Sequence, residues 1–245
     1  MRKVCFSTGN FYIPGKTNLN KEIKKTIELG VDGVEVTIGR ATDMRTLKLD
    51  KKIIKELRKL NYNAIHAPFY LFQTKTKNRR IYYWNSDYYK RLLKKMHRLY
   101  DNIEAVNMNF HPNLIKNFKL LENNDYNYSI ENMTPHWNNK LSYYKKILDK
   151  YPHINFLLDT SHATLCKELD ALVKKFKKRI THVHLSNVVD EKEHSFLHDS
   201  GKNELKKLNV VKKLNVPFII ETWYENEEAF KLFKKEVNFV RKWLK

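Results

Sequence analysis

Cysteine, glycine and proline are all scarce in this chain, with two, six and six among 245 residues. The two cysteines, Cys5 and Cys166, show no paired spacing, which excludes a disulfide framework and a zinc–thiolate site and fits a reducing compartment. The segment Ser7–Asn10 (STGN) lacks the GxGxxG spacing of a dinucleotide-binding loop. Apolar runs are too short for a membrane span, and the first residues lack the apolar stretch of a signal peptide. We therefore expect a cytoplasmic protein without membrane contact.

Acidic residues are also few: 27 Asp and Glu stand against 47 Lys and Arg, which gives a net charge of +20. Such a charge is compatible with a polyanionic partner, either nucleic acid or a phosphorylated substrate. The alternative is a compositional bias, because most of these lysines fall on what the periodicity predicts to be solvated helix faces.

Short apolar runs rich in β-branched residues alternate with helical patterns along the whole chain. The predicted strands span 4–8, 33–38, 63–67, 105–110, 126–130, 154–159, 179–185 and 216–220. Helices are expected between them, among them 92–103, a short one at 114–121, 165–176 and a last one at 229–244. Eight strand–helix units without a linker predict an α/β fold, a single-domain (β/α)8 TIM barrel over residues 1–245. An open doubly wound sheet is the alternative.

Residues with metal-ligand chemistry stand at the predicted strand ends. They are Glu35, His66, His111, Glu131, Asp159, His162, His184 and Glu221. Each has an ordinary structural interpretation, such as a turn, a helix cap or a buried histidine, but that interpretation must hold many times at the same end of a strand. In a closed barrel these ends converge on one face.

Electrostatics favours a bound cation at this face. Glu131, Asp159 and Glu221 would meet in an apolar barrel mouth, where three carboxylates cannot ionise together unless a cation compensates them. The interleaved imidazoles make a divalent metal the simplest solution. Zn²⁺ is the first choice, and Mn²⁺ and Fe²⁺ suit the same ligands.

A basic and aromatic segment follows the third strand and so is expected at the same face. We predict that its side chains contact phosphates and stack on bases; the alternative is that the aromatics cover the barrel rim. The candidates are Lys75, Lys77, Arg79, Arg80, Tyr82 and Trp84.

Six motifs, in this order along the chain, resemble the xylose isomerase-like barrels, a superfamily that includes endonuclease IV and many sugar isomerases and epimerases. They are IHAPF (65–69), FHP (110–112), IEN (130–132), LDTSHA (158–163), VHLSN (183–187) and IET (220–222).

The endonuclease IV branch implies up to three zinc ions. His66, His111 and Glu131 would hold one ion, and Glu131 would bridge to a second, which Asp159, His184 and Glu221 complete. His162 and His194 would serve a third. There the sequence departs from the pattern, because Lys192 occupies the place of an expected acid; Glu193, His198 or Asp199 are possible substitutes.

The isomerase branch implies one metal on Glu131, Asp159, His184 and Glu221, and the segment 30–36 (GVDGVEV) resembles this branch more than the nuclease branch. A barrel without activity that binds metal or nucleic acid is also conceivable, but the intact set of carboxylates and imidazoles argues against it, so two enzymatic functions lead. One is a metal-dependent hydrolase of abasic DNA, and the other is a sugar or sugar-phosphate isomerase or epimerase. The catalytic candidates are Glu131, Glu221 and His162, and we expect a monomer or a small homo-oligomer.

Overall fold

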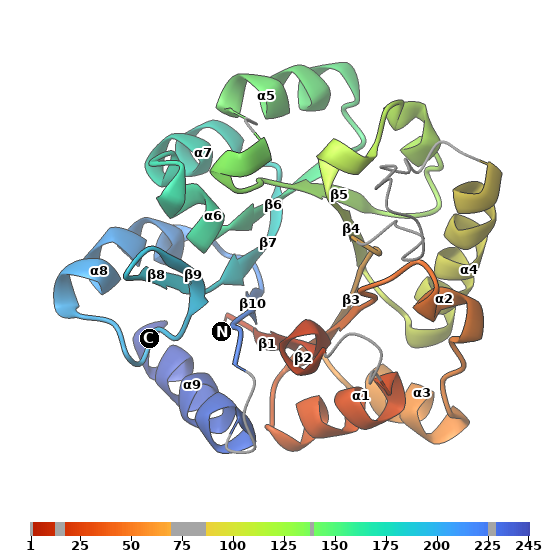
Figure 1. Ribbon diagram of the computed structural model, residues 1–245, viewed down its shortest axis with the longest axis horizontal. Coiled ribbons are helices and arrows are strands. Elements are labelled where there is room, and N and C mark those ends of the chain that lie inside the picture. The colour runs from red at the N-terminus through yellow and green to blue at the C-terminus, as the bar shows by residue number, and fades with distance from the viewer. Residues whose placement is uncertain (1, 13–17, 70–86, 138–139, 225–228) are drawn as a thin grey trace, which may run out of the picture.

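Eight parallel strands close into a barrel in the computed structural model, which describes residues 2–12, 18–69, 87–137, 140–224 and 229–245. Around the barrel the strand order is β1-β10-β7-β6-β5-β4-β3-β2 (Figure 1). The bounds are β1 Val4–Ser7, β2 Gly33–Thr37, β3 Tyr62–His66, β4 Asn107–Phe110, β5 Tyr128–Glu131, β6 Asn155–Asp159, β7 Ile180–Leu185 and β10 Phe218–Ile220. The predicted single-domain TIM barrel is confirmed.

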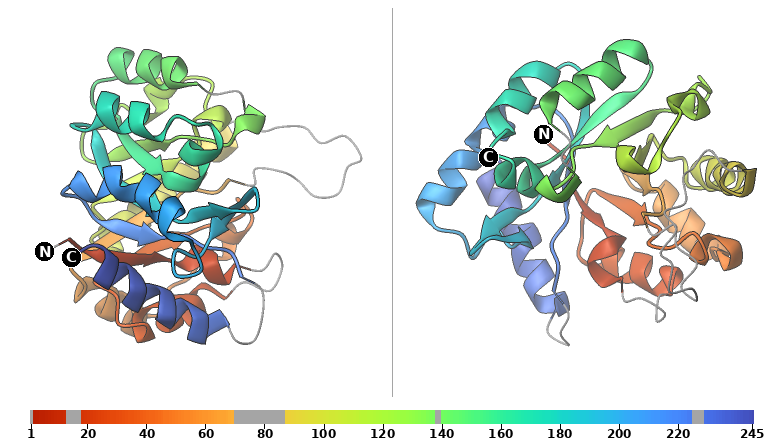
Figure 2. Two further views of the ribbon diagram at one scale, coloured as in Figure 1. Left: turned by 90° about the vertical axis from the view of Figure 1, so that its left-hand side faces the viewer. Right: turned by 45° about the horizontal axis from the view of Figure 1, so that its top comes forward.

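Helices surround the barrel on the outside in every view (Figures 1 and 2). They are α1 Leu19–Glu28, α2 Asp43–Thr46, α3 Lys51–Arg58, α4 Asp87–Ile103, α5 Leu141–Lys150, α6 Thr160–Leu165, α7 Leu169–Phe176, α8 Lys202–Lys207 and α9 Ala229–Trp243. No helix in the described part of the chain is long and apolar enough to cross a membrane.

Two details of the predicted element pattern are wrong. The helix expected at 165–176 is α7, preceded by a separate turn of helix, α6, whose N-cap is Asp159. The helix expected at 114–121 consists of two short 3₁₀ turns, Pro112–Leu114 and Phe118–Leu121. A hairpin of β8 (Asn187–Val189) and β9 (Lys192–Ser195) also follows β7, where the sequence suggested no strands.

The core is divided by the alternation of side chains along each strand. Apolar residues on the outer face of the barrel, such as Val34, Ile65 and Phe156, pack with the helices in one continuous cluster. Inside the barrel, a second and much smaller cluster holds Cys5, Tyr62, Ala64 and Ile219, and the rest of the interior is largely polar. This distribution places the chemistry within the barrel rather than on its surface.

Gly33 lies where β2 passes closest to its neighbours. A Cβ at this position would come within 2.2 Å of the Tyr62 carbonyl oxygen and 2.8 Å of Cys5 Sγ. We predict that Gly33→Ala lowers the free energy of unfolding by about 2–3 kcal/mol, because two paired strands must separate to admit the methyl group. Urea unfolding measures this loss. Gly201→Ala is the control, because its methyl group meets nothing nearer than 3.5 Å; equal stability losses in both variants would contradict the steric argument.

Candidate metal centre

Four ligand side chains meet at the carboxyl-terminal mouth of the barrel. Glu131 ends β5, Asp159 ends β6, His184 lies on β7 and Glu221 follows β10. One ligand atom of each lies within 4.8 Å of the others. Glu131, Asp159 and His184 are essentially inaccessible to solvent, whereas Glu221 is 20% exposed. The parallel topology therefore brings together residues that lie far apart in the sequence.

A second group forms around the other oxygen of Glu131. Glu131 Oε2 lies 3.3 Å from His66 Nε2 and 3.6 Å from His111 Nε2, whereas Glu131 Oε1 lies 3.5 Å from His184 Nδ1. The two oxygens of one carboxylate thus face two different sets of imidazoles, which is the arrangement that a carboxylate bridging two metal ions requires.

A third group consists of Asp159, His162 and His194. Lys192, which stands where an acid was expected, is exposed; the neighbouring Glu193 is 41% exposed, and its Oε2 lies 3.9 Å from His162 Nε2. His198 is not available as a substitute, because its Nδ1 pairs with the buried Glu236 carboxylate of α9. Asp199 contacts His198 Nε2 at 3.3 Å.

Backbone carbonyls orient two of the histidines. His66 Nδ1–H donates to the Ala67 carbonyl oxygen at 2.9 Å, and His162 Nδ1–H donates to the Asn132 carbonyl oxygen at 2.8 Å. Each of these bonds requires the proton on Nδ1 and directs Nε2 at the site, where it offers a lone pair once the ring is neutral.

The two carboxylate oxygens of Asp159 have different surroundings. Oδ1 caps α6 by accepting hydrogen bonds from His162 N at 2.7 Å and Ser161 Oγ at 2.9 Å. Among the described residues, Asp159 Oδ2 has no hydrogen-bond partner, whereas His184 Nδ1 approaches the carboxylates of Glu221 at 2.6 Å and of Glu131 at 3.5 Å. Buried polar atoms without partners are rare, because each carries its full desolvation penalty. A divalent cation would satisfy Asp159 Oδ2 and neutralise the carboxylates around His184, so the donor set fits a metal.

The charges in the site point to the same conclusion. Burial alone would raise the pKa of Glu131, but the charge of His184 and hydrogen bonds from His184 and His66 hold it well below its usual range. Burial lowers the pKa of His66, but the Glu131 hydrogen bond and the charges of Glu35 and Glu131 raise it overall to about 9. In the absence of metal, protonated imidazoles therefore balance the carboxylates.

Some residues that support the site were missed by sequence analysis. Asn109 donates from Nδ2 to Glu131 Oε2 at 2.7 Å, and Asn132 exchanges two hydrogen bonds with the backbone of Asp159. Both amides stand within two residues of a predicted ligand, and this proximity was the available signal. The predicted phosphate contacts Lys75, Lys77, Arg79, Arg80, Tyr82 and Trp84 lie outside the described residues.

A family model for xylose isomerase-like TIM barrels matches residues 23–243. The chain belongs to this family. No curated protein matches its sequence. The resemblance seen in the sequence motifs is therefore confirmed at the level of the family.

Solved structures with this fold include enzymes of two kinds. Endonuclease IV from Thermus thermophilus is 17% identical, with a TM-score of 0.66 and coverage of 99% of this chain and 98% of that one. An AP endonuclease of family 2 from Brucella melitensis is 12% identical, with a TM-score of 0.65 and 99% coverage of both chains. A D-allulose 3-epimerase from Methylomonas sp. is 12% identical, with a TM-score of 0.70 and coverage of 99% and 98%. At these identities the likeness shows the fold alone.

Metal binding should release protons. Because the pKa of His66 is raised to about 9 and that of His184 lies well above its usual value, both rings are charged at pH 7, yet a metal ligand must be neutral. We predict the release of two or more protons when Zn²⁺ binds at pH 7, because the pKa of His162 is also raised by Asp159 and Glu131 against the effect of burial, and an affinity that rises with pH up to about 9. Titration calorimetry in buffers of different ionisation enthalpy counts these protons.

Two variants test the source of the protons. His66→Ala should release about one proton fewer. At Zn²⁺ concentrations that saturate the protein, His111→Ala should change the count little, because burial lowers the pKa of His111 to about 3 and the ring is already neutral. Release of no protons by the wild-type protein would contradict this charge state.

Proposed function

We propose that this protein is a divalent-metal-dependent phosphodiesterase that incises DNA at abasic sites. The proposal rests on the two carboxylate oxygens of Glu131, which face different histidines. Oε2 faces His66 and His111, and Oε1 faces His184. This geometry fits two adjacent ions, an arrangement that suits in-line displacement at phosphorus. A single-metal sugar enzyme has no need of the His66 and His111 pair.

Each of up to three ions would have its own set of ligands. His66, His111 and Glu131 would hold one ion, Glu131, Asp159, His184 and Glu221 a second, and His162, His194 and Asp159 or Glu193 a third. Bound ions supply Lewis acidity and lower the pKa of water. Zn²⁺ suits these ligands best, and Mn²⁺ or Fe²⁺ are the alternatives.

The chain's own groups orient and exchange protons around the reacting phosphate. Glu131 and Glu221 are carboxylates with lowered pKa values: burial opposes the lowering and the charge of His184 produces it. Both are therefore ionised and can present an oxygen lone pair to a metal ion or to the proton of an attacking water. His162 keeps its ring fixed by the Asn132 carbonyl oxygen, which leaves Nε2 to contact a metal or a phosphate oxygen.

The partner that best fits the charge is nucleic acid. A net charge of +20 attracts a polyanion over a long range. The segment with Lys75, Lys77, Arg79, Arg80, Tyr82 and Trp84 follows β3, whose end carries His66, and we propose that it contacts the DNA backbone and bases. A cytoplasmic location, and a monomer or small homo-oligomer, complete the proposal.

Incision of a short DNA duplex with one abasic site tests the function. We expect chelator-sensitive cleavage that weakens steeply between low and moderate salt, because phosphate contacts release counterions. His111→Ala should lower the rate at least about 100-fold by removing a ligand of the first ion. His153→Ala is the matched control, because this histidine precedes β6 at the opposite end of the barrel. Full activity in His111→Ala would exclude the two-ion mechanism.

A second candidate function is a sugar or sugar-phosphate isomerase or epimerase. It is favoured by the placement of Glu131 and Glu221, which both belong to one ligand group and approach His184 Nδ1 at 3.5 and 2.6 Å. Two carboxylates in this position can take a proton from one face of a metal-bound sugar and return it to the other. The fold of the Methylomonas epimerase is compatible with the same reaction.

Solvent deuterium separates the two candidates. If the protein is an isomerase or epimerase, a ketohexose or its phosphate should gain deuterium from D₂O. Exchange should be lost in Glu131→Gln and Glu221→Gln, because each carboxylate carries the proton, and should persist in His111→Ala. Mass spectrometry of the recovered sugar measures this. An unlabelled product would rule out the proton-transfer mechanism.

A further inference from the structure

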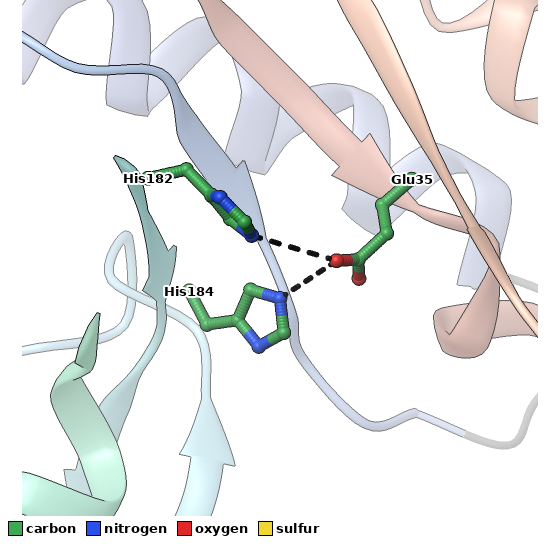
Figure 3. A group of neighbouring side chains, drawn as sticks. All are labelled: Glu35, His182 and His184. Atoms are coloured by element: carbon green, nitrogen blue, oxygen red, sulfur yellow. Dashed lines mark hydrogen bonds and ion pairs between the residues drawn. The ribbon is translucent and has the colours of Figure 1, made fainter. Parts of the chain in front are cut away.

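Glu131 and Glu221 of the candidate metal centre lie near Nδ1 of His184, and a third carboxylate, that of Glu35, lies near the other ring nitrogen. Glu35 of β2 reaches across the barrel to β7, where Oε2 lies 3.1 Å from His184 Nε2 and 3.8 Å from His182 Nε2 (Figure 3). All three side chains are completely buried. Glu35 does not take part in the proposed ligand sets, although these three residues could by themselves hold an ion.

His184 therefore faces acids with both of its ring nitrogens. Nδ1 is directed at Glu221 and Glu131, and Nε2 is directed at Glu35. A neutral imidazole has one lone pair and one N–H, so it can ligate a metal with one nitrogen only. The group of Glu35, His182 and His184 and the group of Glu131, Asp159, His184 and Glu221 are thus alternative ion sites, and the position of the ring proton decides between them.

The number of carboxylates near each ring nitrogen of His184 determines which nitrogen binds the metal. Three carboxylates, Glu131, Asp159 and Glu221, surround the Nδ1 side. Asp159 Oδ2 there and Glu35 Oε1 on the other side are each buried without a hydrogen-bond partner among the described residues. The Nε2 side offers a single carboxylate, Glu35, together with neutral His182. Because the larger uncompensated negative charge attracts the cation, Nδ1 carries the metal and Nε2 keeps the proton.

We propose that Glu35 is a positioning residue, which accepts the Nε2–H of His184 and so fixes the tautomer and ring orientation that present Nδ1 to the metal. A carboxylate behind a ligating histidine also makes the ring a better electron donor. His182 contacts the same Glu35 oxygen from two residues earlier on β7 and limits its movement. The inference rests on the proposed metal centre but serves either proposed reaction.

Equilibrium Zn²⁺ affinity, measured by competition with a chromophoric chelator, tests this role. Glu35→Gln keeps an acceptor but loses the charge, and we expect an affinity about tenfold weaker; Glu35→Leu removes the acceptor, and we expect a loss nearer 100-fold. Glu22→Gln is the matched control, because Glu22 is also a buried carboxylate but lies on α1, away from the site. Melting of the metal-free proteins shows which variants fold.

Nitrogen-15 spectra of histidine-labelled protein loaded with Zn²⁺ give a readout that a merely structural role would not move. His184 should be protonated at Nε2 and ligated through Nδ1. Ligation through Nε2 would place the ion between Glu35 and His182 and overturn the proposal. Unchanged Zn²⁺ affinity in folded Glu35→Gln and Glu35→Leu would overturn it too, while leaving the metal centre intact. If the wild-type protein bound no metal, both the proposed metal centre and the proposed role of Glu35 would be excluded.

Discussion

Mutual repulsion among buried carboxylates is the constraint on which this structure depends. Glu131, Asp159 and Glu221 meet at the barrel mouth and Glu35 lies below them. In a low-dielectric interior such charges are tolerated only beside compensating positive charge. The histidines between them supply that charge when protonated, and metal ions can replace the protons. Protons and a metal ion would thus compete for the same carboxylates and histidines.

The clustering of these side chains could be predicted from sequence because parallel topology is a strong rule. Once the alternation of strands and helices is recognised, every strand must end at the same face, so residues such as His66 and Asp159 are brought together by their order alone. The structure brings together the three groups that the family resemblance implied. Both candidate reactions use this mouth, so the topology predicts the site and not the reaction.

Details that depend on local backbone conformation were not predictable. The hairpin of β8 and β9 turns at Asp190 and Glu191, which both have positive φ angles, 50° and 63°. Such a turn is usually signalled by asparagine and glycine, and neither is present here. The hairpin determines that Glu193, rather than the residue two positions before His194, approaches His162. Likewise, spacing could not show that Glu35 faces His184 across the barrel.

The pairing of β1 with β10 places Val4 beside Phe218 and closes the barrel. A contact over such a distance in sequence forms late in folding, because a long loop must first lose its entropy. Glu236 of α9 then holds the amides of Leu197 and His198, which fixes the loop beyond His194. During synthesis, most ligands leave the ribosome long before these two elements. A metal ion bound by these residues would therefore report the completion of folding and would not nucleate it.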